Sequence, residues 1–113
     1  MTRLFVYGTL KRGRENHHWL AGQRFVAEAR TAPGYRMFDL GGYPGLVRDA
    51  GGLSIEGEIW EVDEPGLARL DILEDIEGGE YERVLIDLDD GSRVEGYLYL
   101  RDVRGRQDCG ASW

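Results

Sequence analysis

The sequence predicts an α+β fold: a single domain over residues 1–113, in which a mixed sheet curls into a compact β-barrel with two short flanking helices. Segments with strand character dominate, and they do not alternate regularly with helices as a doubly wound α/β fold requires. Only two segments have helix character. The 17 glycines lie at turn-like positions, which indicates tight connections between short elements. A chain of this length can bury one modest core.

The first half of the chain predicts strands separated by glycine-rich turns, with one short helix. β-Branched and aromatic side chains predict strands at residues 3–7, 25–31, 35–40 and 55–62. Residues 15–21 are expected to form a short helix that Asn16 caps and Gly22 stops. Gly8 interrupts the first strand, and the glycines and proline of residues 41–45 predict a loop.

The second half predicts a helix followed by a β-hairpin. Asp63 is an acidic N-cap, and Pro65 lies in the first turn, where a missing N–H group costs nothing. We expect this helix to run to about Ile76 and to end near Gly78. Strands are predicted at residues 83–88 and 93–100, joined by a hairpin turn at residues 89–92. After Leu100 the chain becomes polar, which predicts a surface tail.

The charge and composition argue against several classes of function. The formal net charge of −7 argues against a nucleic-acid partner, because phosphate binding needs a basic face. No apolar run approaches the roughly 20 residues that cross a bilayer, and the N-terminus lacks a signal-peptide pattern, so we expect a cytoplasmic protein without a membrane partner. Cys109 is the only cysteine, which rules out a cysteine-only metal site. His17 and His18 are adjacent and would point apart on a helix, which favours a solvated or packing role over metal binding.

The first candidate site is the turn formed by Tyr7, Gly8, Thr9 and Leu10, where an apolar strand gives way to a short polar segment. Because Gly8 has no Cβ, a ligand can approach the nearby backbone closely, and successive amide groups in such a turn form a concavity that binds anions. The glycine spacing and Lys-Ser/Thr pair of a phosphate loop are absent, so a single carboxylate fits better than a phosphate chain. The same residues would also serve as an ordinary turn at the end of a strand.

Glu74 is the candidate acid/base. It follows Leu70 by four positions, and Leu67 precedes Leu70 by three, so all three lie on the helix face that should be buried. Burial raises the pKa of a carboxyl group, and the negative end of the helix dipole would raise it further, as a base working near neutral pH requires. If the helix frays early, Glu74 is instead solvated. If the helix register differs, Glu77 could take this role.

Several of these motifs together resemble the γ-glutamyl cyclotransferase-like proteins, which include the γ-glutamylamine cyclotransferases and AIG2-like proteins. The opening FVYGTLKRG at residues 5–13 is similar to the family's N-terminal signature. LDILE at residues 70–74, followed by YER at residues 81–83, is similar to its second motif, a Leu-Asp-x-x-Glu helix before a Tyr-x-Arg strand. Residues 42–47 also resemble a family segment, and the similarity extends over nearly the whole chain.

The resemblance implies a compact mixed β-barrel with flanking helices. It also implies an enzyme that cyclises a γ-glutamyl group to 5-oxoproline and releases an amine, without a metal or organic cofactor. In the family the glutamate of the second motif is the catalytic acid/base, which maps onto Glu74, and the turn of the first motif holds the ligand. Tyr81 and Tyr99 are expected to be walls of the pocket. Tyr97 and Tyr99 alternate with leucines, and the pattern leaves open which pair faces the core.

The expected mechanism needs no enzyme nucleophile, because the substrate's own α-amine attacks its γ-carbonyl while Glu74 moves the proton. A non-catalytic module that binds a carboxylate or γ-glutamyl ligand on the same fold is an alternative. A further alternative is an enzyme that acts on a larger γ-glutamyl conjugate. The leaving amine is not identified by the sequence, and its selection should depend on residues 41–52 and the tail after Leu100. The short chain and its three tryptophans are compatible with a homodimer.

Overall fold

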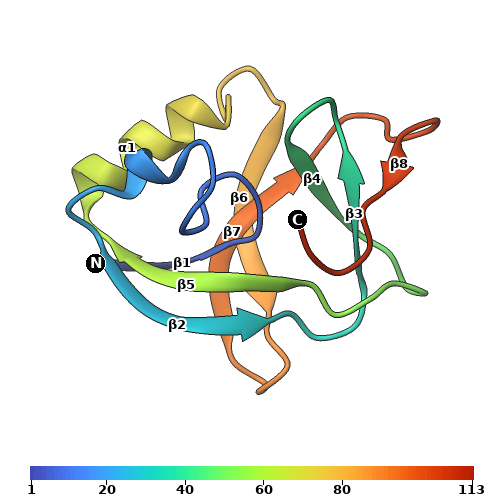
Figure 1. The fold of residues 1–113 in the computed structure, drawn as a ribbon, viewed down its shortest axis with the longest axis horizontal. Coiled ribbons are helices and arrows are strands. Elements are labelled where there is room, and N and C mark those ends of the chain that lie inside the picture. The colour runs from blue at the N-terminus through green and yellow to red at the C-terminus, as the bar shows by residue number, and fades with distance from the viewer.

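The computed structural model describes all residues 1–113 as eight strands, one α-helix and one short 3-10 helix (Figure 1). In chain order the elements are β1 (Thr2–Val6), η1 (His17–Leu20), β2 (Arg24–Arg30), β3 (Tyr35–Asp39), β4 (Pro44–Arg48), β5 (Glu56–Val62), α1 (Glu64–Leu73), β6 (Tyr81–Asp87), β7 (Arg93–Tyr99) and β8 (Gln107–Asp108). None of the helices is long and apolar enough to span a membrane.

The strands form two sheets. Five strands lie in the order β2-β5-β1-β7-β6, and three lie in the order β4-β3-β8. In the larger sheet β1 is central and pairs antiparallel with β5 but parallel with β7, so the expectation of a mixed sheet is confirmed. β1 ends in the middle of this sheet, so the loop that follows it leaves from the centre of the molecule.

The predicted barrel does not close. The two edge strands of the larger sheet, β2 and β6, meet only just beyond their ends, where Thr31 and Leu88 form an isolated bridge. Beside this bridge the Ala32 N–H donates to the Asp87 carbonyl over 2.9 Å, and the Asp89 N–H donates to the Arg30 carbonyl over 3.0 Å. The sheet is therefore curled enough for its edges to touch at one end, but β2 and β6 do not pair along their lengths.

The single α-helix begins as predicted. Asp63 is its N-cap, and the Asp63 Oδ1 atom accepts a hydrogen bond from the Gly66 N–H over 2.7 Å. The helix ends at Leu73, three residues before the predicted end at Ile76. Asp75 has a φ of 53°, in the left-handed region that an α-helix cannot accommodate, and the chain turns away there.

The other predicted helix, at residues 15–21, is reduced to the 3-10 helix η1 (His17–Leu20). Asn16 precedes it but makes no side-chain cap. Its amide Nδ2 instead donates to the Thr9 hydroxyl over 3.0 Å, and its backbone N–H donates to the Thr9 carbonyl over 2.9 Å. Asn16 therefore stabilises the preceding loop rather than a longer helix, which sequence spacing alone does not reveal.

Two further expectations are corrected on the side of the smaller sheet. The loop predicted at residues 41–45 is a tight turn at Gly41 and Gly42, and Pro44 already begins β4. The segment after Leu100 is a surface tail only in part: residues 101–108 are mostly exposed, but the segment pairs with β3 as β8 and then runs back toward the centre of the molecule (Figure 1). The Glu56 N–H donates to the Ala111 carbonyl over 2.7 Å, which ties this segment to the larger sheet.

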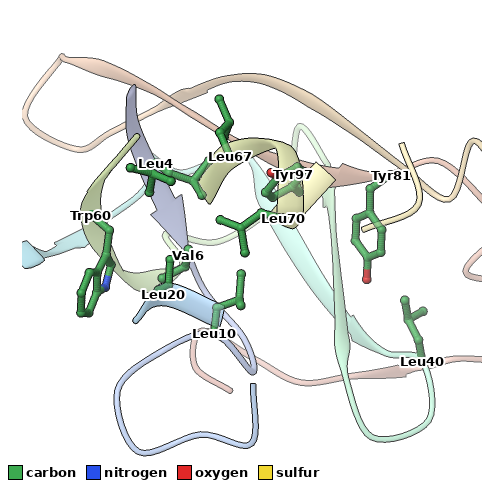
Figure 2. Packing of buried hydrophobic residues seen from close by; sticks show 11 residues of the cluster. Leu4, Val6, Leu10, Leu20, Leu40, Trp60, Leu67, Leu70, Tyr81 and Tyr97 are labelled. Atoms are coloured by element: carbon green, nitrogen blue, oxygen red, sulfur yellow. The ribbon is translucent and has the colours of Figure 1, made fainter. Parts of the chain in front are cut away.

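The core consists of two clusters of eleven buried side chains each. In the first, Leu67 and Leu70 of α1 join side chains of the larger sheet and of the loop after β1, and Leu70 points toward Leu10 in that loop (Figure 2). Its members are Leu4, Val6, Leu10, Leu20, Leu40, Trp60, Val62, Leu67, Leu70, Tyr81 and Tyr97. The second cluster lies between the two sheets, and Trp113 packs against it. The end of α1 and the loop after β1 are thus fixed against the same core.

Candidate active site

A cavity of about 310 Å³ opens where four segments meet: the loop after β1, the β3–β4 turn, the end of α1 and the start of β6. Its volume is at the lower end of the range of small-molecule sites. Six of the seven predicted site residues line it, and these are Tyr7, Gly8, Thr9, Leu10, Glu74 and Tyr81. The two motifs, at residues 5–13 and 70–74, therefore contribute to one site.

The turn after β1 presents free backbone donors at this cavity. The Gly8 carbonyl accepts a hydrogen bond from the Lys11 N–H over 3.1 Å, which closes the turn. The amide groups of Gly8, Thr9 and Leu10 donate no hydrogen bond within the chain, although all three residues line the cavity. Three consecutive free amides are a suitable cradle for one carboxylate.

Gly8 is required by packing as well as by ligand access. A Cβ atom at this position would lie 2.5 Å from Cγ of Pro44, far inside van der Waals contact. The φ of Gly8 is not positive, so the reason for glycine is the close approach of β4 rather than backbone strain. The sequence argument predicted close approach of a ligand at Gly8, and the structure shows close approach of Pro44 as well.

Glu74 lies immediately after α1, at its C-cap, and its side chain lines the cavity. Burial raises the pKa of its carboxyl group to about 7, and the charge of nearby Glu80 contributes in the same direction. The early end of the helix therefore does not leave Glu74 solvated. Glu77 is exposed and lies outside the cavity, so the alternative helix register is not supported.

The tyrosines of the site have mostly structural partners. The Tyr81 hydroxyl donates to the Pro44 carbonyl over 2.8 Å, and the Tyr7 hydroxyl donates to the Tyr97 carbonyl over 2.7 Å. Both phenols thus join the walls of the cavity to each other. Tyr99 does not line the cavity; its ring packs edge-on against Tyr81, with 5.3 Å between centroids. Tyr97 lines the cavity instead, and because Leu98 is also buried, in the second core cluster, both faces of β7 contribute to the core here.

The spacing of the second motif is explained by an ionic network behind Glu74. Asp71, one helical turn earlier, accepts hydrogen bonds from the Tyr97 hydroxyl over 2.8 Å and from Arg83 Nε over 3.0 Å. Arg83 Nη2 also donates to the second Asp71 oxygen over 3.2 Å, so the pair is bidentate. Arg83 and Tyr97 belong to β6 and β7, and the network therefore attaches the end of α1 to the larger sheet.

Sequence reasoning missed several lining residues. Glu80 lines the cavity beside Glu74, and the Tyr43 hydroxyl donates to its Oε1 atom over 3.0 Å. Glu15 and Asn16 line it from the loop before η1. The only available signal was the acidic run that contains Glu80, and no local pattern shows which carboxylate of such a run points inward.

No group of three or more His, Cys, Asp or Glu side chains is arranged to hold a metal ion. His17 lies 3.0 Å, through Nδ1, from the Leu10 carbonyl, and its ring centroid lies 5.2 Å from that of Trp60. Its neighbour His18 is exposed and lies against Trp19. His17 is therefore packed against its neighbours, whereas His18 is largely solvated.

Comparison with known proteins identifies similar sequences and structures over nearly the whole chain. The family model for "Gamma-glutamyl cyclotransferase, AIG2-like" matches residues 4–113. A Vibrio cholerae protein provisionally named a gamma-glutamylcyclotransferase is 46% identical over 97 residues, which cover 86% of this chain and 79% of that protein.

Two solved structures extend this similarity to the fold. The crystal structure of a protein specific to uropathogenic Escherichia coli aligns with a TM-score of 0.87 at 33% identity, covering 99% of this chain and 91% of that one. The crystal structure of an AIG2-like protein from Mus musculus aligns with a TM-score of 0.73 at 30% identity, covering 93% and 80% of the two chains.

Proposed function

The chain belongs to the AIG2-like γ-glutamyl cyclotransferase family, and we propose that it converts the γ-glutamyl group of a γ-glutamyl amine or related conjugate into 5-oxoproline and releases the amine. The observation that carries this proposal is the position of Glu74. Its carboxyl group lines a cavity, forms no ion pair, has a pKa of about 7, and shares that cavity with a turn that offers three free amides. A base poised near neutral pH beside an anion cradle suits this reaction.

The free amides and Glu74 bind different groups of the substrate. The free amides of Gly8, Thr9 and Leu10 bind the α-carboxylate of the glutamyl group, since successive N–H groups favour an anion. Glu74 faces the α-ammonium group, whose unperturbed pKa is about 7.7–8.0. Holding both ends of the glutamyl group folds its flexible chain toward a ring geometry, and this supplies the entropic part of the rate gain.

The chemical step forms one bond and breaks another. Glu74 accepts a proton from the α-ammonium group, and the resulting amine attacks the γ-carboxamide carbon to form the lactam C–N bond. The bond from that carbon to the leaving nitrogen breaks, and protonated Glu74 returns its proton to this nitrogen. Overall, two protons pass from the attacking nitrogen to the leaving one, so the products are 5-oxoproline and an ammonium ion.

The test is mass spectrometry for 5-oxoproline after incubation with γ-glutamyl amines, γ-glutamyl amino acids and glutathione. We expect Glu74→Gln to lower turnover by about 10²–10⁴-fold, because the amide cannot accept the proton. Glu77→Gln is the matched control, since Glu77 lies in the same acidic run but outside the cavity. Normal turnover by Glu74→Gln would end the proposal. Stabilisation by a ligand without any turnover would favour a binding module.

A further inference from the structure

The cavity carries carboxylates without any cationic partner. Glu15, Glu74 and Glu80 line it, whereas no lysine, arginine or histidine does. Twelve ion pairs occur elsewhere in the chain, and none of them involves these three residues. On a surface where most arginines pair with an acid, this unpaired group of carboxylates is unusual and coincides with the candidate active site.

One side-chain and two backbone hydrogen bonds attach Glu80 to the neighbouring segments. Tyr43 donates to its carboxylate over 3.0 Å. Its backbone N–H donates to the Asp75 carbonyl over 3.2 Å, and its carbonyl accepts from the Leu100 N–H over 2.9 Å. The carboxylate therefore keeps a defined position on the cavity wall, between the end of α1 and the β3–β4 turn.

The arginines near this rim have other partners. Arg106 donates to the Leu40 carbonyl over 3.3 Å, and Arg101 lies 3.9 Å from Asp75. Neither lines the cavity. The cavity lining therefore contains Glu80 but none of the chain's cations.

The glutamyl part of the substrate complements only part of the negative charge of the cavity. In the proposed function its ammonium group faces Glu74, and its carboxylate binds the free amides. Glu80 and Glu15 then have no complement. A leaving group that carries a carboxylate would be repelled by them, and one that carries a cation would be attracted.

We propose that this site selects γ-glutamyl conjugates of diamines, whose leaving group carries a second, positively charged amino group that Glu80 receives. The inference rests on the proposed function and adds the chemical class of the leaving amine. In this proposal Glu80 is the specificity-determining residue, and Glu15, an exposed residue of the loop before η1 that also lines the cavity, makes a smaller contribution.

The experiment compares three substrates of matched length that differ only in the charge at the end of the leaving group: the γ-glutamyl conjugates of putrescine, butylamine and γ-aminobutyrate. We expect kcat/KM to be about tenfold higher for the cationic conjugate than for the neutral one, and lowest for the anionic one. Glu80→Gln should reduce the cationic preference to about twofold, whereas Glu77→Gln should leave it unchanged.

The preference for the cationic conjugate is measured as the ratio of its kcat/KM to that of the neutral conjugate, for the same variant at the same pH. Loss of the Glu80 charge also alters the protonation of Glu74, but this affects both substrates equally and cancels in the ratio. A structural defect in Glu80→Gln would likewise lower all three rates together. Only a direct interaction between Glu80 and the leaving group changes the ratio.

The outcomes separate the two proposals. If 5-oxoproline forms but the neutral or anionic conjugate reacts as well as the cationic one, the diamine inference is wrong and the proposed function stands. If no conjugate reacts, the proposed function fails, and calorimetric binding of the same three conjugates to Glu74→Gln decides the inference. Tighter binding of the cationic conjugate supports it, and an equal or reversed order, or no binding, overturns it.

Discussion

At the scale of single residues, Glu74 shows how a site is built at the cost of stability. Its carboxyl group lies in the cavity wall with only Glu80 as a charged neighbour, and both burial and that neighbour oppose ionisation. The same environment that keeps the group protonated until about pH 7 makes it a usable base. The ordinary acids of this chain, which pair with arginine, cannot serve in this way.

The pH dependence of catalysis should follow from this environment. We expect the acidic limb of the kcat/KM profile to have an apparent pKa near 7, because Glu74 must be ionised to accept a proton. Glu80→Gln removes a charge that raises the pKa of Glu74, so the acidic limb should move to lower pH. The alkaline limb belongs to the substrate's α-amine and should stay in place. The same profile for both proteins would contradict the role given to Glu80.

The stability of the protein should also report on Glu74. Because its pKa is higher in the folded state than the ordinary 4.5, the folded protein binds the proton more tightly, and stability falls as pH rises from about 4.5 to 7. Glu74→Gln removes this loss and should raise the free energy of unfolding at pH 8 by up to about 3 kcal/mol.

Urea denaturation at pH 8 and pH 4 checks this prediction. The stabilisation should be present at pH 8 and nearly absent at pH 4, where the carboxyl group is protonated in both states. Glu77→Gln, at an exposed position, should show no such difference. A Glu74→Gln protein that is less stable than the parent at pH 8 would contradict the burial argument.

At the scale of elements, the site depends on where each element ends. α1 ends at Leu73, and this places Glu74 beyond the helix, with its side chain in the cavity. β1 ends at Val6 in the centre of the larger sheet, so the following turn reaches the same place. The Asp71–Arg83 pair fixes the end of α1 to β6. The second motif therefore encodes a junction between helix and sheet as well as the proposed acid/base.

The packing of β4 against the turn after β1 predicts the effect of Gly8→Ala. The added methyl group would clash with the Pro44 ring, so the β3–β4 turn or the cradle must shift. We expect a loss of about 1–3 kcal/mol in the free energy of unfolding, typical of overpacking, together with weaker binding of substrate. Denaturant unfolding and KM measure the two effects.

Gly51→Ala is the control for this substitution. A Cβ at Gly51 would make only an ordinary contact of 3.7 Å with an Asp49 carboxylate oxygen, and its φ is not positive. It should change stability by no more than about 0.5 kcal/mol, as surface substitutions usually do. If both variants change the free energy of unfolding equally, the close contact with Pro44 does not explain why position 8 is glycine.

At the scale of the whole molecule, the C-terminal segment joins parts that are far apart in sequence. Trp113 packs against the second core cluster, and its carbonyl accepts hydrogen bonds from Lys11, over 3.1 Å, and from Arg14. Both donors lie in the loop that continues from the turn proposed to bind the substrate. The segment therefore supports the candidate site from behind without lining it.

Trp113→Ala tests this support. Loss of a half-buried indole should lower the free energy of unfolding by about 1–3 kcal/mol, less than for a fully buried aromatic residue. Because the backbone of the loop becomes less constrained, KM should rise more than kcat falls. Ser112→Ala, one residue away and exposed, should leave both stability and kinetics nearly unchanged. Equal effects of the two substitutions would show that the indole has no such role.

The sequence by itself determined the α+β class, most strands, the start of α1 at Asp63 and, through its resemblance to a family, the two motifs that meet in the cavity. These depend on interactions between residues close in the chain: side-chain periodicity, a cap and glycine-bounded turns. Only the tertiary structure decided the rest, namely that the barrel stays open, that Cys109 and Trp113 pack against the core, that Tyr97 rather than Tyr99 lines the cavity, and that Glu80 joins Glu74 there. Each of these depends on contacts between distant segments, whose free energies no local pattern records.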